Sequence, residues 1–528
     1  MSRIIKKQDV KPKKEILAVN RVVYFFTVIL LAVFPLYYHN YYFDILPAKY
    51  KFYYCAVIAM AICLIAALLI FNRKDVSVRG IRLTVPDVCM LLLIIIIAIS
   101  TLQSDYKYES LWGNEARYNG LFLWFMYGLS YVMITGFLKV KNSLMDWFLA
   151  AGLLVCLFGI TDYFGMDLLH FKVNVRASQK NIFTSTFGNI NVYTAYVGMV
   201  SAVAVTLYAT ARTKGRTICY FVVMVISFLA MIMGRSDNGY LAMGVIFAVL
   251  PFYLFTTRTG IKRYFVSIAS LLTAVWAIHI ADQIWPDRVM GLDSLFGMMS
   301  RSKLLIYGVG VLWILIAVFY AADYYRRDKK KDLDQEKLGK MPRYLWGAFL
   351  GLCLAVVLGV LYDANIAGNG SRYEKFAEYL IFNDQWGTDR GFVWKLCISH
   401  FKDFSFMRKL FGFGPDTFGI LTSTYDMNLM MDYNGVFFDS AHNEYLHYLI
   451  TIGLLGTAAY VTLLGTSAWR IMRKAGDNPY AAAAVFAVLA YAAQAAVNIA
   501  QPIITPFMFT LLMIGLAACN QKEKDLIK

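Results

Sequence analysis

The chain has 528 residues, of which 59% are hydrophobic and only 16% are charged, and its formal net charge is +17. A soluble protein of this length carries roughly 25% charged residues, so the composition excludes a soluble globular enzyme and predicts an integral membrane protein. The positive charge is interpreted as basic residues in cytoplasmic loops, not as a nucleic-acid-binding surface.

Apolar runs long enough to cross a bilayer recur from one end of the chain to the other. We predict an all-α integral membrane protein, a single polytopic membrane domain over residues 1–528, with about 14 transmembrane helices. The approximate cores of these helices are 22–38, 52–71, 87–102, 120–137, 144–162, 190–209, 217–234, 239–256, 264–281, 303–322, 344–362, 442–468, 479–499 and 503–519.

Basic residues alternate along this series. Counted from the N-terminus, the even-numbered connections are rich in Lys and Arg, as in 73–82 and around Lys329–Lys331. The positive-inside rule therefore predicts that both termini are cytoplasmic. The longest connection, 363–441 between predicted helices 11 and 12, is then extracytoplasmic, and its spacing of apolar residues predicts one or two short amphipathic helices.

A polar cluster, Ser440-Ala441-His442-Asn443-Glu444-Tyr445, stands at the start of the predicted helix 442–468. Polar groups are costly at the mouth of a spanning helix unless they have a use. Gly453 and Gly456 follow at spacings that would place them on the same helical face as His442, where they would let another helix approach closely. Histidine can accept a hydroxyl proton near neutral pH, so His442 is the first catalytic candidate. Glu444 is a second base candidate, with a helix N-terminal charge as the alternative reading.

Several arginines also lie in the predicted outer connections, where the positive-inside rule disfavours them. Arg117, Arg176, Arg235 and Arg390 each belong to a different outer connection. Guanidinium groups bind phosphate oxygens bidentately and stay charged in a poor dielectric. The set therefore suits an anionic, lipid-attached substrate, although contact with anionic lipid stays open as the alternative for Arg117 and Arg176.

Four motifs resemble the bacterial O-antigen ligase and Wzy-type polymerase superfamily, and they occur in that family's order. The His442-Asn443 pair with Gly453 and Gly456 resembles its histidine motif. The others are Arg117-Tyr118-Asn119-Gly120-Leu121, Thr186-Phe187-Gly188-Asn189-Ile190-Asn191, and Asp389-Arg390-Gly391 with Trp394 and Phe411-Gly412-Phe413-Gly414. The resemblance covers roughly residues 110–460. Ile190 stands where the family has proline. The family often has an arginine directly after the serine that corresponds to Ser236, whereas here Arg235 comes directly before that serine.

The resemblance implies a metal-independent, inverting membrane glycosyltransferase of the GT-C type, without cofactors, in the bacterial cytoplasmic membrane. Its donor would be a glycan on undecaprenyl diphosphate, and its acceptor a glycan or glycolipid hydroxyl at the outer face. Transfer and polymerisation stay equally open, and a lipid-linked glycan flippase or a non-enzymatic envelope scaffold are the alternatives. The candidate catalytic residues are His442, Arg390 and Glu444, and the candidate substrate-binding residues are Arg117, Arg176, Asn189, Asn191, Arg235, Trp394 and Asn443.

Overall fold

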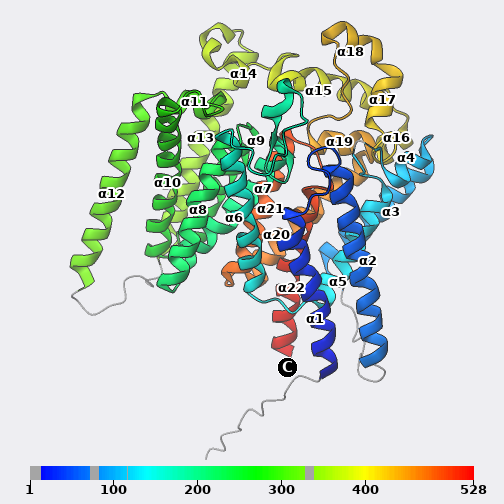
Figure 1. Cartoon of the computed structure of the whole chain (residues 1–528), viewed down its shortest axis with the longest axis horizontal. Helices are drawn as coiled ribbons and strands as arrows, with labels where there is room; N and C mark the ends of the chain where they lie inside the picture. The colour runs from blue at the N-terminus through cyan, green and yellow to red at the C-terminus, as the bar shows by residue number, and fades with distance from the viewer. Residues whose placement is uncertain (1–13, 72–82, 116, 328–337, 528) are drawn as a thin grey trace, which may run out of the picture.

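The computed structural model describes residues 14–71, 83–115, 117–327 and 338–527. Helices form almost all of the regular structure and run side by side as one bundle (Figure 1). This confirms the all-α membrane fold in its general form. The predicted basic clusters at 73–82 and Lys329–Lys331 lie outside the described residues.

Each predicted apolar segment coincides with a long helix, except that segment 442–468 is divided in two. The long helices are α1 (Lys14–Val28) with its continuation η1 (Ile29–Val33) and η2 (Phe34–Leu36), α2 (Ile45–Phe71), α3 (Val85–Gln103), α5 (Leu121–Phe137), α6 (Ser143–Tyr163), α7 (Ile190–Thr210), α8 (Lys214–Met233), α9 (Asn238–Leu254), α10 (Arg258–Ile284), α12 (Lys303–Arg327), α13 (Met341–Asn365), α20 (Gly453–Ala475), α21 (Pro479–Gln494) and α22 (Thr505–Ile527). Among the described residues, 10 helices are long and apolar enough to cross a membrane, and α5 and α9 are shorter apolar helices. The number of spans predicted from the sequence therefore stays a prediction.

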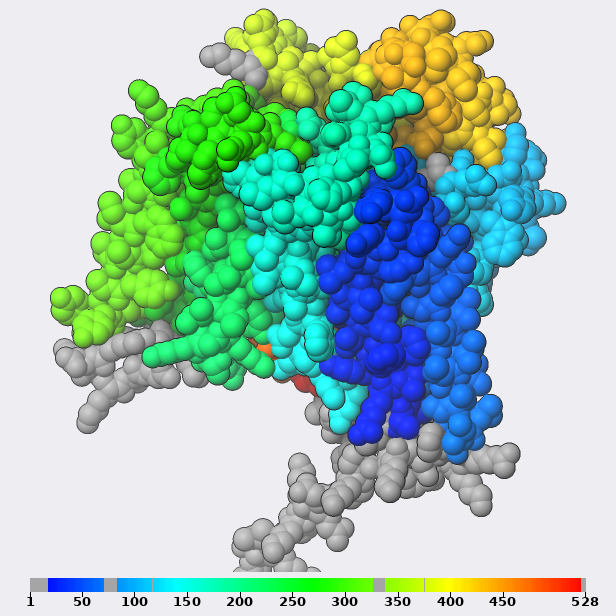
Figure 2. Space-filling view, viewed as in Figure 1, coloured from blue at the N-terminus to red at the C-terminus, as the bar shows by residue number. Residues whose placement is uncertain are grey.

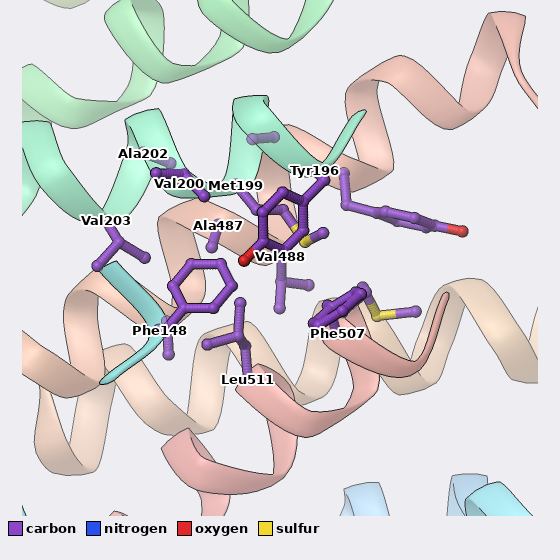
Figure 3. Close-up of a cluster of buried hydrophobic side chains, with 14 of the residues drawn as sticks. Phe148, Tyr196, Met199, Val200, Ala202, Val203, Ala487, Val488, Phe507 and Leu511 are labelled. Carbon is purple, nitrogen blue, oxygen red and sulfur yellow. The ribbon is translucent and has the colours of Figure 1, made fainter. Parts of the chain in front are cut away.

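The centre of the bundle is built around α7, whose apolar span is 89% buried. α7 packs against α8 and α21, and the small side chains of Ala481–Ala484 let helix backbones approach closely. Figure 3 shows Phe148 of α6, Tyr196 of α7 and Phe507 of α22 meeting in this core. The rings of Tyr196 and Phe507 lie 4.9 Å apart between centroids. By contrast, the apolar span of α13 is 0% buried, so its side chains face outward, where a bilayer would cover them.

Residues 363–441, here called the cap segment, cover one end of the bundle (Figures 1 and 2). The start of α1 and the end of α22 lie at the opposite end. We call the end that carries the cap segment the cap face. The cap segment contains η5 (Gly370–Phe376), α14 (Ala377–Leu380), α15 (Trp386–Asp403), α16 (Phe406–Phe411), α17 (Phe418–Tyr425) and α18 (Met427–Asn434).

The prediction of one or two short helices in this segment is therefore wrong in number. Helices of 4 to 8 residues, such as α14 and α16 to α18, hold too few turns to give a visible apolar period. The cap segment also packs around apolar side chains of its own rather than lying loosely on the bundle. These buried side chains include Phe392, Val393, Leu396, Phe413, Phe418 and Met430.

Smaller elements complete the cap face. α4 (Lys107–Trp112) and α11 (Ser294–Ser300) are short helices in the connections before α5 and α12. The connection before α7 contains η3 (Ala177–Ile182) and two short strands, β1 (Phe183–Thr184) and β2 (Gly188–Asn189). The strands pair antiparallel, with Phe183 opposite Asn189 and Thr184 opposite Gly188.

The predicted helix 442–468 is divided into α19 (Glu444–Thr451) and α20. The break falls at Gly453, whose φ of +72° is a left-handed conformation that favours glycine. A Cβ at this position would lie 2.4 Å from the carbonyl carbon of Leu410, so the two backbones are in direct contact. Glycine is therefore required here by the backbone and not by a helix–helix seam.

Long-range hydrogen bonds stabilise the break. The carbonyls of Ile450 and Thr451 accept from the N–H groups of Phe413 and Gly414, at 2.8 and 2.9 Å, instead of from the next helical turn. His442 precedes α19, and α19 is not continuous with α20. The prediction that His442 and the two glycines share one helical face is therefore wrong, because it assumed a single unbroken helix.

Candidate active site

Arg390 opens the regular part of α15 after a strained turn. Gly387, Thr388 and Asp389 have φ values of +62°, +60° and +65°. A left-handed conformation costs roughly 1–2 kcal/mol for a residue with a Cβ, and Thr388 is β-branched as well. The carboxylate of Asp389 accepts a tyrosine hydroxyl and an asparagine amide from α18, each at 3.0 Å. Because α18 holds this turn, the position of Arg390 is fixed, and its Nη1 donates to the carbonyl of Gly387 at 2.5 Å.

His442 lies in the short connection between the cap segment and α19, with a φ of +47°. On one side of it, Trp394 of α15 donates its indole N–H to the carbonyl of Ala441 at 3.0 Å. On the other side, Asn443 caps α19, and its Oδ1 accepts two amides of the first turn at 3.0 and 3.1 Å. The backbone of His442 is thus held from both neighbours, while its side chain stays partly exposed.

Arg117 reaches the same place from the connection between α4 and α5. Its Nη2 forms an ion pair of 2.5 Å with Oδ1 of Asp439, three residues before His442. Burial, Arg390 and Arg117 lower the pKa of His442 to about 4, in that order of size, and Asp439 opposes them. Two guanidinium groups from distant segments therefore act on one imidazole, which is neutral near pH 7.

Arg235 is placed differently. It has a φ of +52° and forms an ion pair with Asp293, just before α11. It nevertheless lies close in sequence to Asp237, whose charge acts on Arg390 and opposes the lowering of the arginine pKa by burial. The start of α9 is therefore next to Arg390, but among the described residues the recorded ion pair of Arg235 is with Asp293.

Asn189 and Asn191 stand at the start of α7. The Oδ1 of Asn189 caps this helix by accepting the N–H of Asn191 at 2.8 Å. The Oδ1 of Asn191 accepts the hydroxyl of Ser236 at 2.6 Å, which joins α7 to the connection between α8 and α9. In this structure, both side chains therefore stabilise the start of α7 and its contact with the neighbouring connection.

The carbonyl of Asn191 extends this contact into a buried amide network that sequence reasoning missed. It accepts from the side-chain amides of Asn238, at 2.9 Å, and Asn498, at 3.1 Å. Asn498 in turn donates to Gln494 at 2.7 Å. The signal available in the sequence was the pair of amides near the end of the predicted span 479–499, where a uniformly apolar helix has none.

Arg176 is exposed at the start of η3. Within the part of the chain that the structure describes, no hydrogen bond or ion pair is recorded between its side chain and the other candidates. The charges of Arg117 and Arg390 both act on His442, whereas Arg176 stands apart.

Glu444 is 1% exposed. Its two carboxylate oxygens accept hydroxyls from Tyr460 of α20, at 2.5 Å, and Tyr491 of α21, at 2.9 Å. A base that acts on a substrate needs access to it, and Glu444 has none. These contacts favour a structural role, in which the carboxylate joins α19 to α20 and α21, over the predicted catalytic one.

Comparison with known proteins gives one family. Residues 288–461 match the family model Wzy_C, described as O-antigen ligase. The matched range runs from the connection before α11 to the first part of α20, and it includes Arg390 and His442. No curated protein matches the chain. The resemblance expected from the sequence motifs is confirmed over this range.

Proposed function

We propose that the protein transfers or polymerises a glycan carried on undecaprenyl diphosphate, because residues 288–461 match the family model described as O-antigen ligase. The acceptor is a sugar hydroxyl, and the reaction takes place at the outer face of the bacterial cytoplasmic membrane, in surface polysaccharide biosynthesis. The observation that carries the proposal is the meeting of distant segments around His442, where Trp394 bonds to the carbonyl of Ala441 and Arg117 pairs with Asp439. The reaction is that of an inverting glycosyltransferase without a metal ion or another cofactor.

Arg390 and Arg117 are the proposed ligands of the diphosphate. Arg390 is held by the carbonyl of Gly387 and Arg117 by Asp439, and fixed donors of this kind can stabilise charge that develops on a leaving group. Arg117 is paired with Asp439 in the free protein, so phosphate oxygens take the place of a carboxylate when the donor binds. Arg235 and Asn191 stay proposed contacts of the donor, because Asp237 near both of them acts on Arg390.

His442 is the proposed partner of the acceptor hydroxyl. The hydroxyl oxygen attacks the anomeric carbon, the bond from that carbon to the diphosphate oxygen breaks, and its electron pair leaves with undecaprenyl diphosphate. The hydroxyl proton passes to the imidazole of His442. With a pKa of about 4 the free imidazole is a weak base. The bound diphosphate offsets the charges of Arg390 and Arg117, so donor binding raises this pKa toward the range in which a general base is effective.

Trp394 is the proposed sugar contact beside this centre. Its indole N–H is used in the bond to the carbonyl of Ala441, which fixes the ring plane. The ring of Trp386 lies 5.0 Å away between centroids. Two fixed aromatic rings next to Arg390 give a surface on which a sugar ring can pack.

We place the cap face outside the cell and both termini in the cytoplasm. This rests on the charge alternation along the chain and on the position of the cap segment, opposite the start of α1 and the end of α22 (Figure 1). The partners are then the lipid-linked glycan donor, a glycan or glycolipid acceptor and membrane lipids. The family match does not favour the flippase alternative.

Binding of the donor's charged part can be tested without knowing the glycan. The purified protein is reconstituted in nanodiscs, and its affinity for undecaprenyl diphosphate is measured for the wild type, Arg390→Gln and Arg408→Gln. Arg408 is the matched control, because it lies in the same cap segment and pairs with Asp105 at 2.5 Å. Loss of one charged hydrogen-bond partner costs about 1.5–3 kcal/mol, so Arg390→Gln should weaken binding by about 10-fold or more. Equal affinity of all three proteins would contradict the proposal.

The acceptor decides between polymerase and ligase, and the products of a deletion strain reveal it. Loss of long chains with single repeats retained identifies a polymerase. Accumulation of finished chains on the lipid carrier identifies a ligase. An unchanged profile of lipid-linked and finished glycans would contradict both.

A further inference from the structure

The loop that carries Arg117 is closed on itself. A Cβ on Gly120 would lie 2.3 Å from the backbone nitrogen of Gly113, and a Cβ on Gly113 would lie 2.6 Å from the Cα of Tyr118. The two ends of the loop are therefore in backbone contact, and Gly113 has a φ of +91°. The orientation of Arg117 therefore depends on what holds these two ends.

Both ends are held by one carboxylate. Oδ2 of Asp416 accepts the backbone N–H of Asn114 at 2.6 Å and that of Asn119 at 3.0 Å. Asp416 is 4% exposed, and burial raises its pKa to about 7, while the two backbone bonds and Arg117 lower it. A carboxyl group is costly to bury. The two backbone N–H groups that bond to this carboxyl group both belong to the Arg117 loop.

Asp416 also lies next to the segment that holds α19, the helix that follows His442. It follows the segment whose residues Phe413 and Gly414 donate to the last carbonyls of α19. The connection therefore runs from α19 through Asp416 to the loop, and from Arg117 back to Asp439 beside His442. Arg117, which is proposed to face the donor, and His442, which is proposed to face the acceptor, are therefore held by the same set of contacts.

We propose that Asp416 is a positioning residue that sets the Arg117 guanidinium beside His442 by clamping both ends of the Arg117 loop. The inference rests on the proposed function in one respect, namely that Arg117 contributes to transfer. Asp416 itself does not touch the substrate.

A double-mutant cycle tests whether Asp416 acts through Arg117. Transfer rates are compared for the wild type, Arg117→Ala, Asp416→Ala and the double variant, each normalised to folded protein. Losing one preorganised donor costs ~10²-fold in rate, so each single variant should lose between ~10-fold and ~100-fold, and the double variant should lose no more than the larger single loss. Ser104→Ala is the matched control, because it removes a buried hydroxyl bonded to Ser110 in the same junction, and its rate should stay within about 2-fold of the wild type. Losses that multiply in the double variant would overturn the proposal.

Asp416→Asn separates the clamp from general folding. It retains an acceptor oxygen for both backbone N–H groups, so it should recover most of the activity that Asp416→Ala loses. Hydrogen exchange of the amides of Asn114 and Asn119 supplies a readout that needs no substrate. Exchange there should rise in Asp416→Ala and stay near the wild-type rate in Asp416→Asn. Unchanged exchange in Asp416→Ala would overturn the clamp, whereas an inactive wild type with the expected exchange pattern would instead contradict the proposed function.

Discussion

The pH dependence of the transfer rate should shift in opposite directions when a positive or a negative charge near His442 is removed. The imidazole must be neutral to accept a proton, so kcat/KM of the free enzyme should fall as the pH decreases through its pKa of about 4. Arg117→Gln removes a positive charge that lowers this pKa, and it also leaves Asp439 unpaired. The acid limb, which is the fall in kcat/KM at low pH, should therefore move to higher pH. Asp439→Asn removes the opposing negative charge, and the limb should move to lower pH.

The size of these changes follows from the order of the causes. The pKa of His442 is lowered from 6.5 to about 4, with burial as the largest cause, Arg390 as the second and Arg117 as the third. Arg117 therefore accounts for only part of the depression, and we expect Arg117→Gln to move the limb by roughly 0.5–1 pH unit. This corresponds to about 0.7–1.4 kcal/mol.

The assay measures kcat/KM between about pH 3.5 and 8 for both variants and the wild type in nanodiscs, using a lipid-linked glycan donor. Recovery of full activity after return to neutral pH controls for acid unfolding. Movement of both limbs in the same direction, or of neither, would refute the electrostatic account of His442.

Three further substitutions separate structural from functional residues. Glu444→Gln should lower thermal stability by about 1–3 kcal/mol, because it disturbs a buried doubly bonded carboxylate, while the folded fraction keeps its transfer rate; a folded but inactive variant would restore the catalytic reading. Gly453→Ala should abolish folded protein on size-exclusion chromatography, whereas Gly465→Ala, which faces open space, should elute as the wild type does; equal yields would contradict the backbone junction. Trp394→Phe keeps an aromatic ring but loses the indole bond to the buried carbonyl of Ala441, so stability should fall by about 1–3 kcal/mol and kcat of the folded fraction by about 10-fold. An unchanged kcat would show that this bond does not position His442.

The general fold and the centre of the site are accessible from the sequence. Long apolar runs predict helices directly, because a bilayer leaves the backbone few other ways to satisfy its hydrogen bonds. Arg390 and His442 are found from local motifs, since each stands at the start of a helix with its glycine or asparagine neighbours. Their proximity to each other was an inference from topology, and the structure places Arg390 where its charge acts on His442.

The remaining features depend on contacts between distant segments. Arg117 is joined to Asp439 across the whole middle of the chain, and its local motif does not indicate that partner. The break before Gly453 lies in a continuous apolar run and arises because the 410–414 backbone takes the place of the next helical turn. The burial of Glu444 follows from two tyrosines on other helices, which a sequence motif cannot show.

The most direct test of the central claim is transfer of glycan from an undecaprenyl-diphosphate donor by the purified protein, compared between the wild type and His442→Ala under single-turnover conditions. The account predicts transfer by the wild type and a loss of ~10²-fold or more in the variant, which lacks the group that accepts the hydroxyl proton. Donor binding by the variant should remain, because Arg390 and Arg117 are unchanged. Transfer at the wild-type rate by His442→Ala would contradict the account.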